Sequence, residues 1–379
     1  MSPLTHSGLR RAGVNILVVG GFLAAAWQVA WIATAVWPDP ASIDVDAGQV
    51  WHQAERIRAD QPLYEPIAGY GPHYMWTVRY PSESHSPHLP LLASIVALLP
   101  PVSLATFLRV WYVVILLAGW GYAATLSALS TGSVGLRGTV AWNAVLVAWP
   151  GSLGALFQGN PEPVLWLLFG LAMALSAFRG GFLALMAGVK PYALFPLAAA
   201  VGRERGPVVR AAVWAALGTA LVCVVAMGPA DLAAAARQWW TTVPAQVGQG
   251  TWKPSNLSLS FLPVRFARAR GWVEEVGPLP VPARHWLLLA GIAGPALAAW
   301  GTRRLRPRLQ YGLTMVAAVL SSPLCWPTYL TYGFVPLALL LGPDDRDPGA
   351  AGALRTGGTA DSRTPSDGRP DWRVWRDPA

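Results

Sequence analysis

"GVNILVVGGFLAAAWQVAWIATAV", residues 13–36, contains no charged side chain. A bilayer core is crossed by about 20 mostly apolar residues in a helix, and this stretch is long enough. It is also longer than the apolar core of a signal peptide, which is about 7–15 residues. The stretch therefore predicts an uncleaved first transmembrane span.

The composition of the whole chain indicates an integral membrane protein. Of 379 residues, 54% are hydrophobic and 12% are charged, whereas soluble domains carry about 25% charged residues. The formal net charge of +9 is typical of a nucleic-acid-binding protein as well. The basic residues, however, stand in short clusters between apolar runs, as the positive-inside rule requires, so we expect membrane lipids and no nucleic acid as partners.

Apolar windows recur along most of the chain and predict an all-α, polytopic helical bundle of about ten spans. The windows are 13–36, 89–102, 104–127, 138–157, 162–178, 181–202, 208–228, 285–302, 309–323 and 326–342. Window 89–102 is the weakest, because Pro100 and Pro101 close it.

Arginine clusters predict the orientation of these spans. Clusters at 10–11, 203–210 and 303–308 are expected on the cytoplasmic side. The long segments 38–88 and 229–284 then form extracytoplasmic loops of a multi-pass protein in a bacterial plasma membrane. Residues 1–342 make up this membrane domain. Residues 343–379, rich in Pro, Gly, Asp, Ser and Arg, are expected to form a disordered cytoplasmic tail.

The first long loop contains "VWHQAERIRADQPLY", residues 50–64, which has the pattern of a short amphipathic helix. Val50, Ala54 and Ile57 share one face, and Gln53, Glu55, Arg56 and Arg58 are expected on the other. We expect this helix to lie on the membrane surface. Asp44 and Asp46 precede it, either as residues that cap the helix or as residues with a chemical role.

Lys190 lies near the middle of an apolar window and is followed by Pro191, which interrupts helical hydrogen bonding. A lysine at the centre of a membrane helix costs about 2.5 to 3.5 kcal/mol. A functional cation facing a lipid phosphate is one explanation, and a lysine that snorkels or pairs with Glu162 is the other.

Three further stretches carry polar or aromatic groups between apolar windows. They are "FQGNPEP" (157–163), "WKPSNLSLSFLPVR" (252–265) and "SSPLCWPTYLTY" (321–332). Each has a structural explanation, namely a capped turn, a polar loop and a belt of interfacial aromatics. Phosphate-loop, dinucleotide and zinc motifs are absent from the sequence, so no cofactor and no metal site are expected.

The order of these motifs resembles glycosyltransferase family 87. The residues that carry the resemblance run from about 44 to 342: an aspartate before a helix ending in "QPLY", then "RYPSES", "QGNPEPVLWLLFGLAMAL", "AGVKPYALFPL", "NLSLSFLPVR" and "LSSPLCWPTYL". The resemblance implies the GT-C fold and a polyprenyl-phosphate-mannose-dependent α-mannosyltransferase. Its active site would be extracytoplasmic and would pass a sugar to a lipid or glycan acceptor.

The same resemblance implies roles for particular residues. Asp46, counted back from "PLY", corresponds to the catalytic base. Lys190, the pair Gln158 and Asn160, and the pair Asn256 and Ser258 match motifs of the family that bind the donor phosphate or the substrates. Tyr192, Arg265, Trp326 and Tyr329 are expected to bind there too, as neighbouring cationic or aromatic residues. The chain departs from the family at Thr328, where a histidine is common, and His52, His73, His85 or His88 is a candidate replacement.

Two functional classes remain open from the sequence. The first is a metal-independent glycosyltransferase that uses a polyprenyl-phosphate sugar, with mannose as the expected sugar and arabinose as an alternative. The second is a transporter or flippase for a lipid-linked sugar, which would also need cations and broken helices in the membrane.

Overall fold

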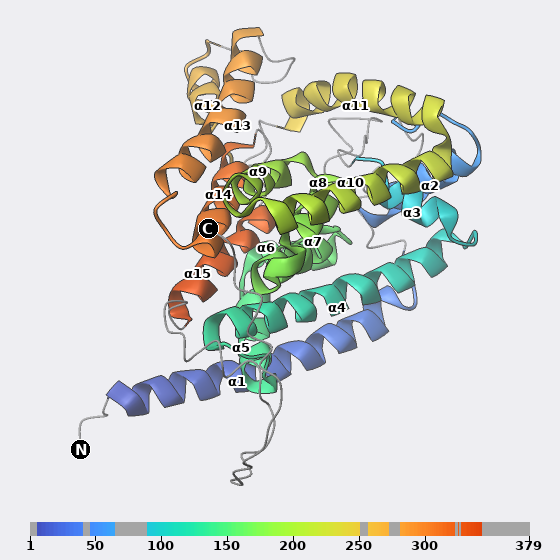
Figure 1. Cartoon of the computed structure of the whole chain (residues 1–379). Helices are drawn as coiled ribbons and strands as arrows, with labels where there is room; N and C mark the ends of the chain where they lie inside the picture. Colours follow the sequence, from blue (N-terminus) through green and yellow to red (C-terminus); the bar gives the residue numbers. More distant parts are fainter. Residues whose placement is uncertain are drawn as a thin grey trace, which may run out of the picture. The chain divides into compact units, whose positions relative to one another are not determined.

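A computed structural model of the chain describes residues 6–40, 46–64, 89–250, 257–272, 281–322, 325 and 327–342. Within these ranges the chain forms helices and connecting turns, and no strand. The expected tail, residues 343–379, lies outside them. The α-helices are α1 (His6–Trp31), α2 (Ala47–Arg58), α3 (Leu91–Leu98), α4 (Leu104–Thr131), α5 (Leu136–Ala148), α6 (Pro150–Phe157), α7 (Glu162–Ala174), α8 (Arg179–Ala187), α9 (Leu194–Glu204), α10 (Gly206–Met227), α11 (Pro229–Gly250), α12 (Leu262–Ala269), α13 (Val281–Gly301), α14 (Pro307–Ser321) and α15 (Phe334–Leu341) (Figure 1).

Three helical segments among the described residues are long and apolar enough to cross a membrane. They are Ala12–Val36, Leu104–Thr131 and Gly206–Met227. The first continues α1 through one turn of π-helix, Ile32–Val36. These segments confirm the predicted windows 13–36, 104–127 and 208–228. The expected number of about ten spans is not confirmed, because the count is three, or up to five if each of two bent helix pairs is one span.

Two bent helix pairs account for part of the difference from the expected number of spans. Between α5 and α6 the chain bends by 83°, and between α7 and the segment Ser176–Ala187 it bends by 119°. Pro150 lies at the first position of α6, where its missing N–H is tolerated and the preceding helix cannot continue. Window 89–102 yields only the eight residues of α3, which extend about 12 Å against a bilayer core of about 30 Å.

The helices pack around one main apolar core. The uninterrupted α4 packs against α5 and α7, and α8 packs against α10 (Figure 1). Tyr122 of α4, Phe169 of α7 and Tyr332 are fully buried in the main cluster. The Tyr122 hydroxyl donates to the carbonyl of Thr331 over 2.9 Å. This bond fixes the 3-10 turn Pro327–Gly333 against α4 and α7.

The predicted amphipathic helix is present as α2, but its surroundings differ from the expectation. Val50, Ala54 and Ile57 are buried, as predicted. Gln53, which we placed on the polar face, is also buried, because it is three residues from Val50 and joins the same face. This face packs against α3 and α4. The apolar face of α2 is therefore covered by protein, and the position of the helix at the membrane surface stays a prediction.

Candidate active site

A buried carboxylate, Glu162, is the centre of the largest polar network in the described part of the chain. Its Oε1 accepts from the Lys190 ammonium at 2.5 Å and its Oε2 accepts from the Tyr332 hydroxyl at 2.8 Å. The Tyr192 hydroxyl is 3.0 and 3.1 Å from the two oxygens. Glu162 has no exposed surface. A buried charge needs such partners, because desolvation would otherwise be very costly.

Lys190 links this network to Tyr329. Its ammonium donates to the Tyr329 hydroxyl over 3.1 Å and lies 4.5 Å from the centre of the same ring. An ammonium has three donors, and the described residues provide acceptors for two of them. The pairing with Glu162 is the second of the two explanations offered by the sequence. The third N–H has no acceptor among the described residues.

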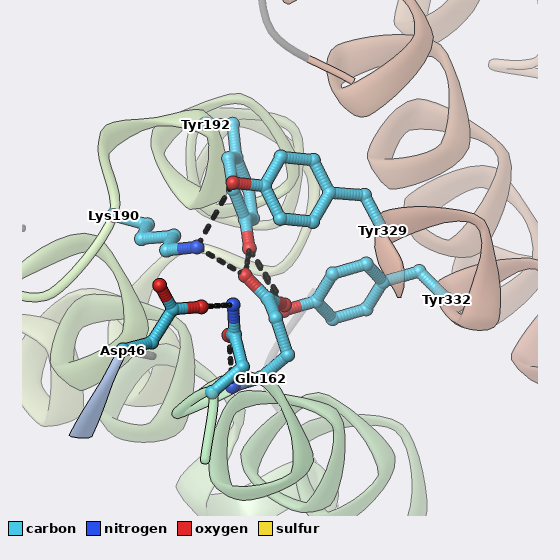
Figure 2. A network of polar contacts seen from close by, with 7 residues as sticks. Asp46, Glu162, Lys190, Tyr192, Tyr329 and Tyr332 are labelled. Atoms are coloured by element: carbon cyan, nitrogen blue, oxygen red, sulfur yellow. Dashed lines mark hydrogen bonds and ion pairs between the residues drawn. The ribbon is translucent and has the colours of Figure 1, made fainter. Parts of the chain in front are cut away.

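Asp46 forms the second arm of the site. Its backbone N–H donates to the carbonyl of Gln158 over 2.9 Å, and its Oδ2 accepts from the Asn160 amide over 2.7 Å. Its side chain makes no capping bond to α2. Figure 2 shows Asp46 beside the network that joins Glu162, Lys190 and the tyrosines.

The Gln158–Asn160 turn joins the two arms. The Asn160 side-chain oxygen accepts the backbone N–H of Glu162 over 3.0 Å, so one amide contacts both the Asp46 carboxylate and the first turn of α7. Gly159 has a φ of +63°, which glycine adopts without the penalty of a Cβ. Its carbonyl accepts from the Trp111 indole of α4 over 2.8 Å. The turn is thus held by α4 and presents Asn160 to Asp46.

Every residue of the network comes from a helix end or a short 3-10 turn. Asp46 precedes α2 and Glu162 begins α7. Lys190 has extended backbone before the 3-10 turn Pro191–Ala193, and Tyr329 and Tyr332 lie in the turn Pro327–Gly333. Non-helical backbone at membrane depth is tolerated where it is inside protein or lines a water-filled cavity. The breaks that shorten the spans are therefore the positions that supply polar groups.

The other sequence candidates that the structure describes are Ser258 and Arg265. Ser258 is buried and its hydroxyl is 2.8 Å from that of Ser260. Arg265 of α12 lies over the Phe261 ring, 5.8 Å from its centre. The backbone N–H of Leu257 donates to the carbonyl of Cys325 over 2.6 Å, which places this segment beside the chain that leads to Tyr329. Asn256 and Trp326 lie outside the described residues.

Thr328 and the histidines can also be placed in part. Thr328 is buried, and its hydroxyl has no hydrogen-bond partner among the described residues. His52 lies on α2 with its ring 4.9 Å from that of Trp51. Burial, and next the Arg56 cation, lower the pKa of His52, which keeps the imidazole neutral near pH 7. His73, His85 and His88 lie outside the described ranges.

Glu162 and Tyr332 are the two network residues absent from our predicted site. Glu162 was considered only as a partner that would make Lys190 structural. The signal that could have found it is the pairing of one acid and one lysine in neighbouring apolar windows, each next to a proline. Tyr332 was interpreted as an interfacial aromatic, and nothing in its local sequence indicates the contact with Glu162.

Comparison with protein families identifies the family of the chain. The model of glycosyltransferase family 87 matches residues 85–327, which is more than half of the chain. The chain belongs to glycosyltransferase family 87. Neither a curated protein nor a solved structure matches it.

As a family 87 glycosyltransferase, the protein acts on a sugar donor and an acceptor, and its apolar helices are those of a membrane protein. The matched residues contain the Gln158–Asn160 turn, Glu162, Lys190 and Ser258. Asp46 precedes them, and its place in the site follows from its contacts with Gln158 and Asn160.

Proposed function

We propose that this family 87 protein transfers a sugar, with mannose as the first candidate, from a polyprenyl-phosphate donor to a hydroxyl of a lipid or glycan acceptor. We further propose that the reaction occurs on the extracytoplasmic side of the plasma membrane in a GT-C-type bundle. The observation that carries the proposal is that Asn160 contacts both the carboxylate of Asp46 and the backbone of Glu162, and that the Glu162 carboxylate pairs with Lys190. A carboxylate and a cation thus lie close together in one site (Figure 2).

Asp46 is suited to the role of general base. Its Oδ2 is held by the Asn160 amide, which fixes the carboxylate without neutralising it. In the proposed step the acceptor O–H bond breaks and its proton passes to Asp46. The oxygen forms a bond to the anomeric carbon of the donor, and the bond from that carbon to the phosphate oxygen breaks. General-base catalysis of this kind contributes about 10²- to 10⁴-fold in rate.

Lys190 is suited to the leaving phosphate. Negative charge increases on the phosphate as the glycosidic bond breaks, and a preorganised cation stabilises it. Glu162 and Tyr329 hold the ammonium in place through two of its hydrogens, and the third is left to donate to a phosphate oxygen. Glu162 thus acts as a positioning residue, since its own oxygens are occupied by Lys190, Tyr192 and Tyr332.

A transfer assay tests this proposal. Membranes containing the protein would be incubated with radiolabelled polyprenyl-phosphate mannose and a lipid extract as acceptor. The proposal expects label in a new glycosidic bond, and no label from a nucleotide mannose when polyprenyl-phosphate synthesis is blocked. Movement of labelled donor across the bilayer without a new bond would instead support the flippase. Transfer from the nucleotide sugar directly would contradict the donor assignment.

A further inference from the structure

A polar pocket of about 160 Å³ lies between the end of α2 and the beginning of α11. Its polar lining consists of Asp60, Gln61, Asp231 and Gln238, and the other lining residues are apolar. A cavity that holds one water needs about 10–15 Å³, so this pocket is many times larger than a single-water cavity. That space is large enough for one sugar ring.

The α11 wall of the pocket follows from helical spacing. Asp231, Ala234, Ala235 and Gln238 have the spacing i, i+3, i+4, i+7 and share one face of the helix. The two alanines leave a shallow floor between the two polar side chains. Gln238 Oε1 also accepts the backbone N–H of Tyr64 over 3.0 Å, which ties this wall to the segment after α2.

At the α2 wall, Asp60 occupies a turn position that usually contains glycine. The N–H of Gln61 donates to the carbonyl of Arg56 over 2.9 Å, and that of Asp60 donates to the carbonyl of Ile57 over 3.3 Å. Helices that end with this pair of hydrogen bonds have a residue in the left-handed conformation just after their last turn, and that residue is usually glycine. Here Asp60 has a φ of +50°. The turn therefore presents a carboxylate at a position where glycine would fit with less strain.

The lining points to a neutral, hydroxylated ligand. Neither Asp60 nor Asp231 forms an ion pair in the described part of the chain, so two carboxylates repel an anion. Carboxylate and amide oxygens accept hydrogen bonds from hydroxyls, and the amides also donate. The apolar part of the lining suits the C–H face of a sugar ring. No group of three or more His, Cys, Asp or Glu side chains suited to a metal occurs among the described residues.

We propose that this pocket is a second carbohydrate subsite, which binds a sugar of the acceptor that does not react. The twelve residues of α2 separate it from Asp46, a distance of about 18 Å along the helix. A sugar in the pocket is therefore several units away from the hydroxyl that loses its proton. The subsite selects acceptors that already carry an oligosaccharide. Its assignment to the acceptor rests on the proposed function.

Cysteine protection tests the pocket directly and without measuring transfer. In the full-length protein in detergent, Ala234→Cys places a thiol on the pocket floor, and Ala236→Cys places one on an exposed part of α11 that does not line the pocket. Both native cysteines, Cys223 and Cys325, are buried. We expect a mannose disaccharide to slow maleimide labelling of Ala234→Cys at least threefold and to leave Ala236→Cys unaffected. Adding Asp231→Asn or Asp60→Gly to Ala234→Cys should remove the protection.

Asp60→Gly serves a second purpose, because it suits the left-handed turn and should keep or raise the melting temperature while removing sugar binding. Equal labelling of Ala234→Cys with and without the disaccharide would overturn the subsite, even if the protein transfers sugar. Protection by inorganic phosphate or calcium in place of the sugar would overturn it as well. Protection by the disaccharide in a protein that transfers no sugar would keep the subsite and contradict the proposed function.

Discussion

The ion pair between Lys190 and Glu162 makes each residue depend on the other, because both are almost fully buried. Removing one partner of a buried pair costs about 3–5 kcal/mol, since the other charge stays desolvated and unpaired. We expect Lys190→Met and Glu162→Gln each to lower the melting temperature in detergent. The double variant should recover most of that stability but remain inactive, because it lacks the cation proposed to face the phosphate. A double variant as unstable as the sum of the two singles would contradict the pairing.

Thr328 gives a second prediction for a single residue. Its hydroxyl is buried and unpartnered among the described residues, so the hydroxyl contributes no hydrogen bond within them. Thr328→Val should leave stability unchanged or raise it. Thr328→His should lower the melting temperature, because inserting a larger side chain in a packed site costs about 1–3 kcal/mol. If Thr328→Val abolishes transfer while the protein stays folded, the hydroxyl has a role with substrate.

At the scale of elements, the turn between α6 and α7 determines whether Asp46 meets Asn160. A Cβ at Gly159 would lie 3.0 Å from the Cβ of Ala47 and 3.2 Å from the Tyr112 hydroxyl, on a backbone with positive φ. We expect Gly159→Ala to displace the start of α2 and to lower kcat about tenfold or more, since a misplaced catalytic group is costly. Gly154→Ala in α6 is the matched control, because no atom lies within 4 Å of its added Cβ. Equal kcat in the two variants would argue against a positioning role for the turn.

Part of the arrangement of these elements could be predicted from the sequence. Asp46 and Asn160 were predicted as site residues from separate motifs, and the structure joins them through one hydrogen bond. The apolar face of α2 was predicted from its period, but not the protein surface that covers it, because periodicity does not say whether lipid or another helix is the partner. Glu162 was missed as a site residue because its local sequence also fits the first turn of a helix, where an acid is favourable.

At the scale of the molecule, the number of spans is the feature that hydropathy predicts least well here. Each window is scored as if it were straight, and the 83° and 119° bends lie at positions where apolar composition continues. The contact between Asp46 and the Gln158–Asn160 turn contradicts a topology of ten straight spans. Ten straight spans place the Gln158–Asn160 turn on the cytoplasmic side, away from Asp46, whereas the two are in contact.

This contact predicts the side on which the turn is exposed. If Asp46 is extracytoplasmic, the exposed Gln158 must be reached from the same side. We expect Gln158→Cys to react with an impermeant thiol reagent in intact cells, and Arg304→Cys, in an arginine cluster expected in the cytoplasm, to react only after permeabilisation. Labelling of Gln158→Cys only in permeabilised cells would place the site on the cytoplasmic side.

If Asp46 removes the acceptor proton, the kcat of Asp46→Asn must fall. Transfer from radiolabelled polyprenyl-phosphate mannose would be measured for wild type, Asp46→Asn and Asp44→Asn at matched amounts of folded protein. We expect Asp46→Asn to lower kcat about 100-fold or more and to keep a melting temperature close to that of wild type. Asp44→Asn should change kcat by less than about twofold. A kcat of Asp46→Asn equal to that of wild type would show that Asp46 is not the general base.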